Sequence, residues 1–302
     1  MLWKIIALNP ERSGYATQRS EHPAGQDSCR LVLYNSLISV AKRAIFKKMF
    51  LSHEEVAEMK PLRKWAEQHF WDSYFQVYDE LNKLTGYQQM LKSVSTIALA
   101  DRTDDAGQVS WLDINCGTGN LFEHLTDRDL AGGQKQDIAM FGTDLNSSAL
   151  AINARKNPQA SLILNDASQG LPYKQDSFSL ITITNGFYVL KAEDQAKLAE
   201  EIKRVLKKGG KVIIADPKPS FSYLSVFIDN LVHRGLSSLK DIWTMIKILR
   251  FNRLIDQKAQ AQQFHYLNQD EFISLFKSKD FELKQFTETY SGQCHLLSLV
   301  KK

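Results

Sequence analysis

Residues 111–119 read Trp-Leu-Asp-Ile-Asn-Cys-Gly-Thr-Gly, and this stretch decides the fold. An apolar run ends at Asp113, a short loop with two glycines follows, and a helical pattern begins at Asn120. Glycine lets a backbone approach a ligand closely because it has no Cβ. The helix directs free N–H groups and the positive end of its dipole at the same place. This order predicts a nucleotide-binding pocket in an open α/β sheet, with Asp113 at the ligand-binding end of its strand.

The loop does not have the pattern of a dinucleotide site, which would read G-x-G-x-x-G. Counted from Gly117 the sixth position is Phe122, and counted from Asn115 the first and last positions are both asparagine. An acid before the loop also suits a ligand with a cationic ammonium better than a pyrophosphate, because like charges repel. An oxidoreductase that uses NAD therefore stays open, but it is less favoured than the two functions given at the end of this section.

Further strand-like runs follow the loop, and the next two end in acids. Residues 139–144 end at Asp144, which lies 25 residues beyond Gly119, near the ~20-residue spacing of an acid that bonds ribose hydroxyls. A helix is expected over residues 147–155. The other expected strands are 162–167 with Asp166, 177–185, and 206–216, where a glycine pair would end a helix before the strand.

Together these features resemble the class I S-adenosylmethionine-dependent methyltransferases, whose first motif is usually written D-x-G-x-G-x-G. Asp113, Gly117 and Gly119 match it, and Asn115 stands where the first glycine is usual. Asparagine tolerates positive φ better than other non-glycine residues. The pattern Leu-Lys-x-Gly-Gly-Lys at residues 206–211 is a further mark of the family. The resemblance implies an α/β, Rossmann-like, doubly wound seven-stranded sheet with an antiparallel terminal hairpin, extra N-terminal helices and a helical lid insert.

The resemblance also implies S-adenosyl-L-methionine as the cofactor. Asp144 would bond the ribose, Asp166 the adenine amino group, and Tyr78 could lie over the sulfonium, because an aromatic face attracts such a cation. Trp71, Tyr74, Phe75 and Tyr78 also have the spacing of a helical apolar stripe. Packing is favoured for Trp71 and Phe75 and stays open for the two tyrosines. The expected cofactor-binding residues are Asp113, Asn115, Cys116, Gly117, Gly119, Asp144, Leu145, Asp166, Ala167, Asn185 and Tyr78.

The rest of the chain divides into flanking segments. We expect residues 1–69 to form an N-terminal arm and helices, and residues 70–302 to form the methyltransferase-like domain. Residues 217–266 form a long insert with two helical patterns, the second of them basic. A lid over the substrate site is favoured over plain surface helices because the insert is long for a connection. The lid's apolar face, with Leu224, Phe227, Ile228 and Leu231, would then favour a hydrophobic acceptor. The tail predicts a helix capped by Asn268 and strands 281–286 and 295–300.

Composition sets broad limits. The 302 residues are 43% hydrophobic and carry a net charge of +4, which does not demand a nucleic-acid partner. Three scattered cysteines show neither metal-ligand spacing nor a disulfide framework, so we expect no metal and a reducing, cytoplasmic setting. No run approaches the ~20 apolar residues that span a bilayer. A basic helix expected over residues 29–50 leaves open a weak contact with a membrane surface or a lipid-like substrate.

Methyl transfer from a sulfonium is an in-line displacement, so the protein must align the reactants and exclude water. An oxygen or nitrogen acceptor can also need a base. His265, where the insert rejoins the domain, and Tyr188, after the fourth strand, are the candidate catalytic residues; His233 and His295 are weaker ones. The expected function is methyl transfer to oxygen, nitrogen or carbon of a small hydrophobic or aromatic acceptor. The alternative is a noncatalytic module that keeps the pocket for regulation or assembly. The sequence does not predict an oligomeric state.

Overall fold

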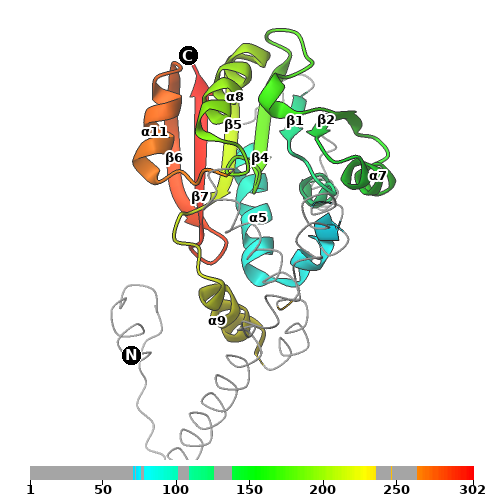
Figure 1. Ribbon diagram of the computed structural model, residues 1–302, viewed down its shortest axis with the longest axis vertical. Helices are drawn as coiled ribbons and strands as arrows, with labels where there is room; N and C mark the ends of the chain where they lie inside the picture. Colours follow the sequence, from blue (N-terminus) through cyan, green and yellow to red (C-terminus); the bar gives the residue numbers. More distant parts are fainter. Residues whose placement is uncertain are drawn as a thin grey trace, which may run out of the picture. The chain divides into compact units, whose positions relative to one another are not determined.

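A seven-stranded sheet forms the centre of the structure, a computed structural model (Figure 1). It describes residues 71, 73–75, 78–100, 109–125, 138–235, 246 and 264–302. The chain divides into two units, residues 1–60 and 61–302, and all described residues belong to the second. The predicted helix over residues 29–50 and the second helix of the insert lie outside the described residues.

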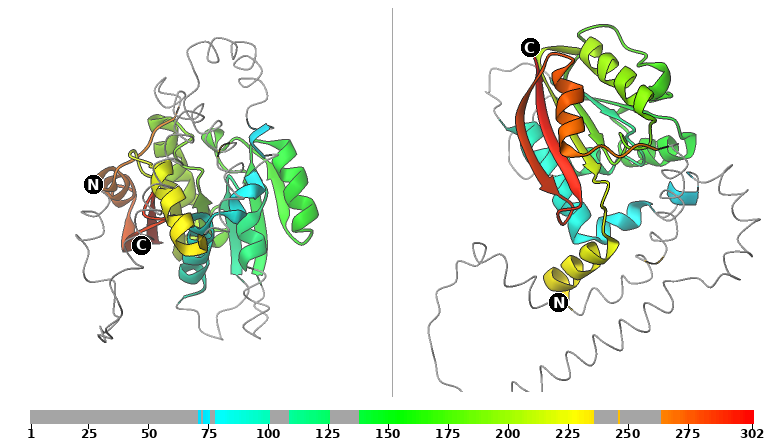
Figure 2. Two further views of the ribbon diagram at one scale, coloured as in Figure 1. Left: turned by 90° about the horizontal axis from the view of Figure 1, so that it is seen from below. Right: turned by 60° about the vertical axis from the view of Figure 1, so that its left-hand side comes forward.

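The strand order is β3-β2-β1-β4-β5-β7-β6. Strands β1 to β5 pair in parallel, and β7 runs antiparallel to both β5 and β6. Figure 2 shows the β6–β7 hairpin in red at the edge of the sheet. The predicted seven-stranded sheet with its antiparallel terminal hairpin is therefore confirmed. The strands are β1 Val109–Ile114, β2 Ile138–Asp144, β3 Ser161–Leu164, β4 Phe178–Thr184, β5 Leu206–Pro217, β6 Phe281–Thr289 and β7 Cys294–Lys301.

Helices cover both faces of the sheet because side chains alternate along each buried strand. Trp111 and Ile213 pack in a cluster with α5, whereas Leu112 and Val212 pack in the opposite cluster with α8 and α11. Figure 1 shows α11 beside β6 and α8 over β5. The helices are α5 Thr85–Leu99, α7 Ser147–Lys156, α8 Ala192–Val205, α9 Tyr223–Arg234 and α11 Gln269–Lys277, with 3-10 turns η2 Asp79–Lys83 and η3 Ala167–Gln169.

The predicted helix starts hold where a side chain caps the backbone. Asn268 accepts from the N–H of Glu271, whose carboxylate accepts from the N–H of Asn268, which forms the expected cap of α11 as a capping box. The side chain of Asn146 caps α7 by accepting a hydrogen bond from the N–H of Ala149. None of the described helices is long and apolar enough to cross a membrane.

The glycine pair Gly209–Gly210 lies within β5 and has a different role from the predicted one. Helix α8 already ends at Val205, and β5 begins at Leu206. The β4–β5 register shifts between Phe178 and Leu180, so Gly209, at φ +73°, lies in an irregular stretch of the strand. The glycine pair therefore allows a bulge in β5 and does not end helix α8.

Helix α9 forms within the insert as predicted, but only part of its predicted apolar stripe is buried. Val226 and Asn230 are buried, and Asn230 Oδ1 accepts from the backbone N–H and the hydroxyl of Thr85 at the start of α5. Leu224 and Ile228 are exposed, whereas Phe227 is partly buried against the core. The hydrogen bonds of Asn230 to α5 hold α9 in a rotation that turns only part of the predicted apolar stripe inward.

Candidate functional site

The loop after β1 takes the left-handed backbone that the motif needs. Asn115, Gly117 and Gly119 have φ values of +56°, +50° and +79°. Asn115 Nδ2 also donates to the carbonyl of Gly186 at 2.7 Å, which ties this loop to the one after β4. Asparagine at the first glycine position therefore keeps the loop conformation, as expected from its tolerance of positive φ.

The space beside Gly119 is occupied by protein. A Cβ at Gly119 would lie 2.2 Å from Oδ1 of Asn153, on α7, and 2.5 Å from Nδ2 of Asn157, the residue that caps the end of α7. At Gly117 a Cβ would lie 3.1 Å from the Phe75 ring. The missing side chain of Gly119 therefore lets α7 approach the loop, and a contact of Gly119 with the cofactor stays a prediction.

Asp113, the last residue but one of β1, belongs to a chain of buried hydrogen bonds. The Trp111 indole donates to Thr182 Oγ1 at 2.8 Å, and the Thr182 hydroxyl donates to Asp113 Oδ1 at 2.5 Å. Burial raises the pKa of Asp113 to about 7, the charge of Asp144 adds to the rise, and the Thr182 hydrogen bond opposes it. The Asp113 carboxylate is thus held in place by the hydrogen bond that it accepts from Thr182 on β4.

Asp144, at the end of β2, binds the loop directly. Its Oδ2 accepts from the N–H of Gly117 at 2.8 Å and its Oδ1 from the N–H of Asn146 at 2.9 Å. Burial raises the pKa of this carboxyl, against the hydrogen bonds from Asn146 and Gly117. Two buried acids whose charges repel would both gain from a cationic ligand. The residues present therefore fit a cofactor that carries a sulfonium and an ammonium.

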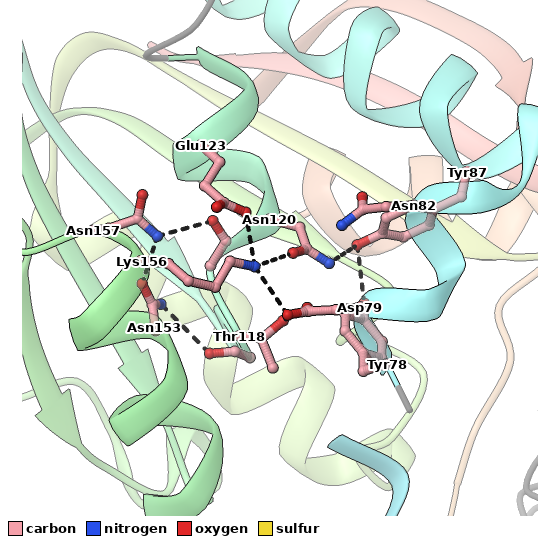
Figure 3. A network of polar contacts seen from close by, with 12 residues as sticks. Tyr78, Asp79, Asn82, Tyr87, Thr118, Asn120, Glu123, Asn153, Lys156 and Asn157 are labelled. Atoms are coloured by element: carbon pink, nitrogen blue, oxygen red, sulfur yellow. Dashed lines mark hydrogen bonds and ion pairs between the residues drawn. The ribbon is translucent and has the colours of Figure 1, made fainter. Parts of the chain in front are cut away.

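A network of polar contacts holds the outer side of the loop (Figure 3). Lys156 Nζ lies 2.7 Å from the Glu123 carboxylate and 3.2 Å from that of Asp79, and it donates to Asn120 Oδ1. Asp79 accepts from the Thr118 hydroxyl at 2.5 Å. The network connects η2, the loop and α7, so three segments far apart in the sequence fix the loop together.

The aromatic residues before η2 lie against the loop. Phe75 is buried beside Gly117, and its ring packs edge-on against Tyr78 at 5.5 Å. The Tyr78 hydroxyl contacts the hydroxyl of Tyr87 at 3.5 Å and the side chain of Asn185. Packing is thus confirmed for Phe75, and the Tyr78 ring also packs edge-on against Tyr74 and Tyr87. A role at the sulfonium stays a prediction.

The remaining predicted cofactor residues lie at the same sheet edge with different exposure. Leu145 is 63% exposed directly after Asp144. Asp166 Oδ1 accepts from the N–H of Ser168 and so starts η3, next to the buried Ala167. The Cys116 thiol points to the protein interior, 3.4 Å from Asn153 Nδ2, and burial raises its pKa well above the usual range. Cys116 could therefore contact a cofactor through its backbone but not through its thiol.

The loop after β4 is held by a carboxylate that the sequence analysis did not single out. Asn185 has φ +51°, and the fully buried Asp216 at the end of β5 accepts from the N–H of Phe187 at 3.1 Å and from those of Gly186 and Tyr188. Burial raises the pKa of Asp216 well above its usual range. An acid at the end of a strand was the available signal in the sequence.

Tyr188 and His265, the two predicted catalytic residues, lie in adjacent segments. The His265 N–H donates to the carbonyl of Tyr188 at 2.8 Å, and the Tyr188 ring stacks on Tyr266 at 4.9 Å. Gln195 on α8 donates to the carbonyl of Phe187, next to Tyr188, and its side-chain oxygen lies against the His265 ring. Burial raises the pKa of Tyr188 well above its usual range, so this phenol stays protonated at neutral pH.

The two weaker histidine candidates lie elsewhere. His233 is an exposed residue of α9 whose Nδ1 lies 2.9 Å from the carbonyl of Asp229. His295 is buried on β7 beside Phe286, and burial lowers its pKa. Across the described part of the chain, no cluster of three or more acids, histidines or cysteines could hold a metal. Sequence reasoning missed Thr182, Gln195 and the α7 carboxamides, because their partners lie on other elements.

Comparisons with known proteins agree with this geometry. Residues 112–210 match a family described as "Methyltransferase domain". The demethylmenaquinone methyltransferase of Oceanobacillus iheyensis is 30% identical over 149 residues, which cover 48% of this chain and 59% of that protein. The ubiquinone/menaquinone biosynthesis C-methyltransferase UbiE of Shewanella oneidensis is 24% identical over 60% of this chain and 69% of its own length. The chain thus spans about six tenths of the length of the first relative.

Among solved structures, the N-methyltransferase NodS of Bradyrhizobium japonicum, in complex with S-adenosyl-L-homocysteine, aligns with a TM-score of 0.49 and 12% identity, over 73% of this chain and 90% of that one. The family match covers β1 to the start of β5, which is the part that carries the loop and the acids at the strand ends. Residues 112–210 thus form a methyltransferase domain of the class I, S-adenosylmethionine-dependent type.

Proposed function

We propose that this protein transfers the methyl group of S-adenosylmethionine to a small aromatic acceptor. The observation that carries the proposal is the pair of buried acids, Asp113 and Asp144, on either side of a left-handed loop. When bound there, the cofactor supplies an electrophilic methyl group. Asp113 would attract its ammonium, Asp144 would accept from the ribose hydroxyls, and Leu145 would offer an apolar surface to the base.

The acceptor is inferred from the aromatic cluster around the loop after β4. Tyr188 stacks on Tyr266, and Phe264 packs edge-on against Tyr188 at 5.9 Å and tilted against Trp71 at 6.2 Å. Such rings favour a flat, apolar partner. The relatives' names point the same way, since demethylmenaquinone and ubiquinone are aromatic or quinonoid molecules. Transfer to a ring carbon of a hydroxylated aromatic or quinol is therefore the acceptor chemistry that we propose.

The two predicted catalytic residues take different roles in this proposal. A phenol is protonated at neutral pH, and burial raises the pKa of Tyr188 further, so Tyr188 would shape the acceptor site and not act as the base. His265 is half-buried and has a ring nitrogen that is not used by Gln195, so it is the better proton acceptor. Removal of a proton from the acceptor by a positioned base contributes about 10²–10⁴-fold to such a reaction.

The alternative of a noncatalytic module loses its main support. It depended on Asn115 in place of glycine and on the lack of an obvious base; Asn115 adopts the required φ of +56°, and His265 is the base that we propose. Cys116 and Cys294 are free and buried, which supports a reducing, cytoplasmic setting. The partner that we propose is the small-molecule acceptor alone.

A matched pair of histidine variants tests the proposal. Purified protein is incubated with methyl-labelled S-adenosylmethionine and four acceptors: a demethylated naphthoquinol with a short isoprenoid tail, a catechol, a phenol and a primary amine. We expect label in the naphthoquinol at a ring carbon. His265→Gln should lower this turnover by about 10²-fold or more, whereas His233→Gln on the exposed side of α9 should not. Binding of S-adenosylhomocysteine without transfer to any acceptor would contradict the proposal.

A further inference from the structure

Gln195 joins segments that meet only in the folded chain. It is 1% exposed on α8. Its Nε2 donates to the carbonyl of Phe187 at 3.0 Å and to the carbonyl of His265 at 2.7 Å. Its Oε1 lies 2.9 Å from Nδ1 of the His265 ring. One side chain thus ties the loop after β4 to the segment that returns from the insert.

The orientation of this carboxamide follows from its partners. Backbone carbonyls only accept hydrogen bonds, so the two carbonyls of Phe187 and His265 require the NH₂ group of Gln195, and both of its protons are used. The oxygen must then face His265 Nδ1. An oxygen without a proton can only accept, so His265 Nδ1 carries the hydrogen. In a neutral imidazole the other nitrogen, Nε2, then holds the lone pair.

We propose that Gln195 is a positioning residue that holds His265 as the Nδ1–H tautomer and so keeps Nε2 ready to take a proton. The role of Nε2 rests on the proposed function, whereas the tautomer is a property of the chain itself. The proton that the acceptor loses goes to Nε2, and the resulting imidazolium keeps its Nδ1–H bond to Gln195 Oε1. No other group needs to change its protonation state in this step.

The backbone around the ring supports the same role. The His265 N–H donates to the carbonyl of Tyr188 at 2.8 Å, and the His265 carbonyl accepts from Gln195. Both polar groups of this peptide segment are therefore fixed to the loop after β4 and to α8. The ring is held at Nδ1 and at its own backbone, which leaves Nε2 as its free end.

The tautomer can be measured without any acceptor. Long-range nitrogen–proton spectra of protein labelled with ¹⁵N-histidine report which ring nitrogen is protonated, and the His265→Gln variant identifies the signal of this residue among the seven histidines. Recorded at a pH where the ring is neutral, the wild-type spectrum should show His265 protonated at Nδ1. A wild-type ring protonated at Nε2 would overturn the proposal.

Two substitutions and one control separate positioning from folding. Gln195→Leu removes the acceptor, so His265 should shift towards the Nε2–H form. Gln195→Glu keeps an acceptor oxygen and should retain the Nδ1–H form, although it loses the donors to the two carbonyls. Gln175→Leu, at an exposed position, should change nothing. An unchanged tautomer in Gln195→Leu would overturn the proposal, and if that variant does not fold, loss of the Nδ1–H form in Gln195→Glu would do so.

Turnover then connects the tautomer to catalysis. In Gln195→Leu we expect kcat to fall about tenfold, with KM for the cofactor unchanged, because Gln195 does not contact the loop after β1. Gln195→Glu should retain more of kcat than Gln195→Leu. A shifted tautomer with an unchanged kcat would overturn the link between Gln195 and the reaction. Absence of transfer to every acceptor in the wild type would instead count against the proposed function.

Discussion

Gly119 gives the most direct test of how the loop is built. Alanine at this position keeps φ at +79° only at a cost of about 1–2 kcal/mol. Its Cβ would also lie 2.2 Å from Asn153 Oδ1 and 2.5 Å from Asn157 Nδ2, so these two buried carboxamides must move. Asn157 Nδ2 would then lose its bonds to the Gly119 carbonyl, at 3.1 Å, and to Asn153 Oδ1, at 2.9 Å.

A buried polar group left without a partner costs about 1–3 kcal/mol, so Gly119→Ala should lose about 2–5 kcal/mol of unfolding free energy. Gly209→Ala is the matched control, because Gly209 has φ +73° and nothing within 4 Å of the added Cβ. It should lose only the conformational part, about 1–2 kcal/mol. Urea denaturation measures both. Equal losses in the two variants would refute the argument that α7 occupies the space beside Gly119.

Three further predictions concern the same sheet edge. Asp144→Ala should weaken binding of S-adenosylhomocysteine by about 1–3 kcal/mol in titration calorimetry, since the N–H of Gly117 also loses its acceptor. Burial raises the pKa of Asp113 to about 7, so the folded chain retains this proton above the pH at which the unfolded chain releases it. The unfolding free energy of the wild type should therefore fall relative to Asp113→Asn as pH rises from about 4 to about 7, by about 4 kcal/mol at most. Asn115→Gly should cost about 1 kcal/mol for the lost bond to Gly186, and Asn115→Ala more, because alanine also resists positive φ.

Each of these has a clear contrary result. Unchanged affinity in Asp144→Ala would remove this acid from the cofactor site. Parallel pH profiles of wild type and Asp113→Asn would mean that Asp113 titrates alike in the folded and unfolded chains. An alanine at position 115 as stable as glycine would show that the left-handed backbone there is not required.

The sequence predicted the parts of this fold that depend on neighbours along the chain. Strands β1, β2 and β4 are mainly apolar runs, and their ends are marked by Asp113, Asp144 and Asn185. The capping residue Asn268 also acts over three residues only. Such features follow from local pattern and side-chain chemistry, so the acids at the cofactor edge could be named without coordinates.

The parts that the sequence did not predict depend on partners from other elements. Whether the space beside Gly119 belongs to a ligand or to Asn153 depends on where α7 packs. The rotation of α9 depends on the bonds of Asn230 to Thr85, 145 residues away. Gln195 has no distinguishing signal in the sequence. Its buried contacts to His265 form only because the fold brings α8 beside a segment 70 residues away.

The hydrogen bonds from Trp111 through Thr182 to Asp113 have a practical consequence. The indole is fully buried, so water does not quench or shift its emission directly. Loss or gain of negative charge on Asp113 changes the field at the indole N–H two hydrogen bonds away. With the other four tryptophans, at positions 3, 65, 71 and 243, replaced by phenylalanine, Trp111 becomes an internal fluorescent reporter. Ligand arrival at the β1 loop could then be followed in real time without any attached dye.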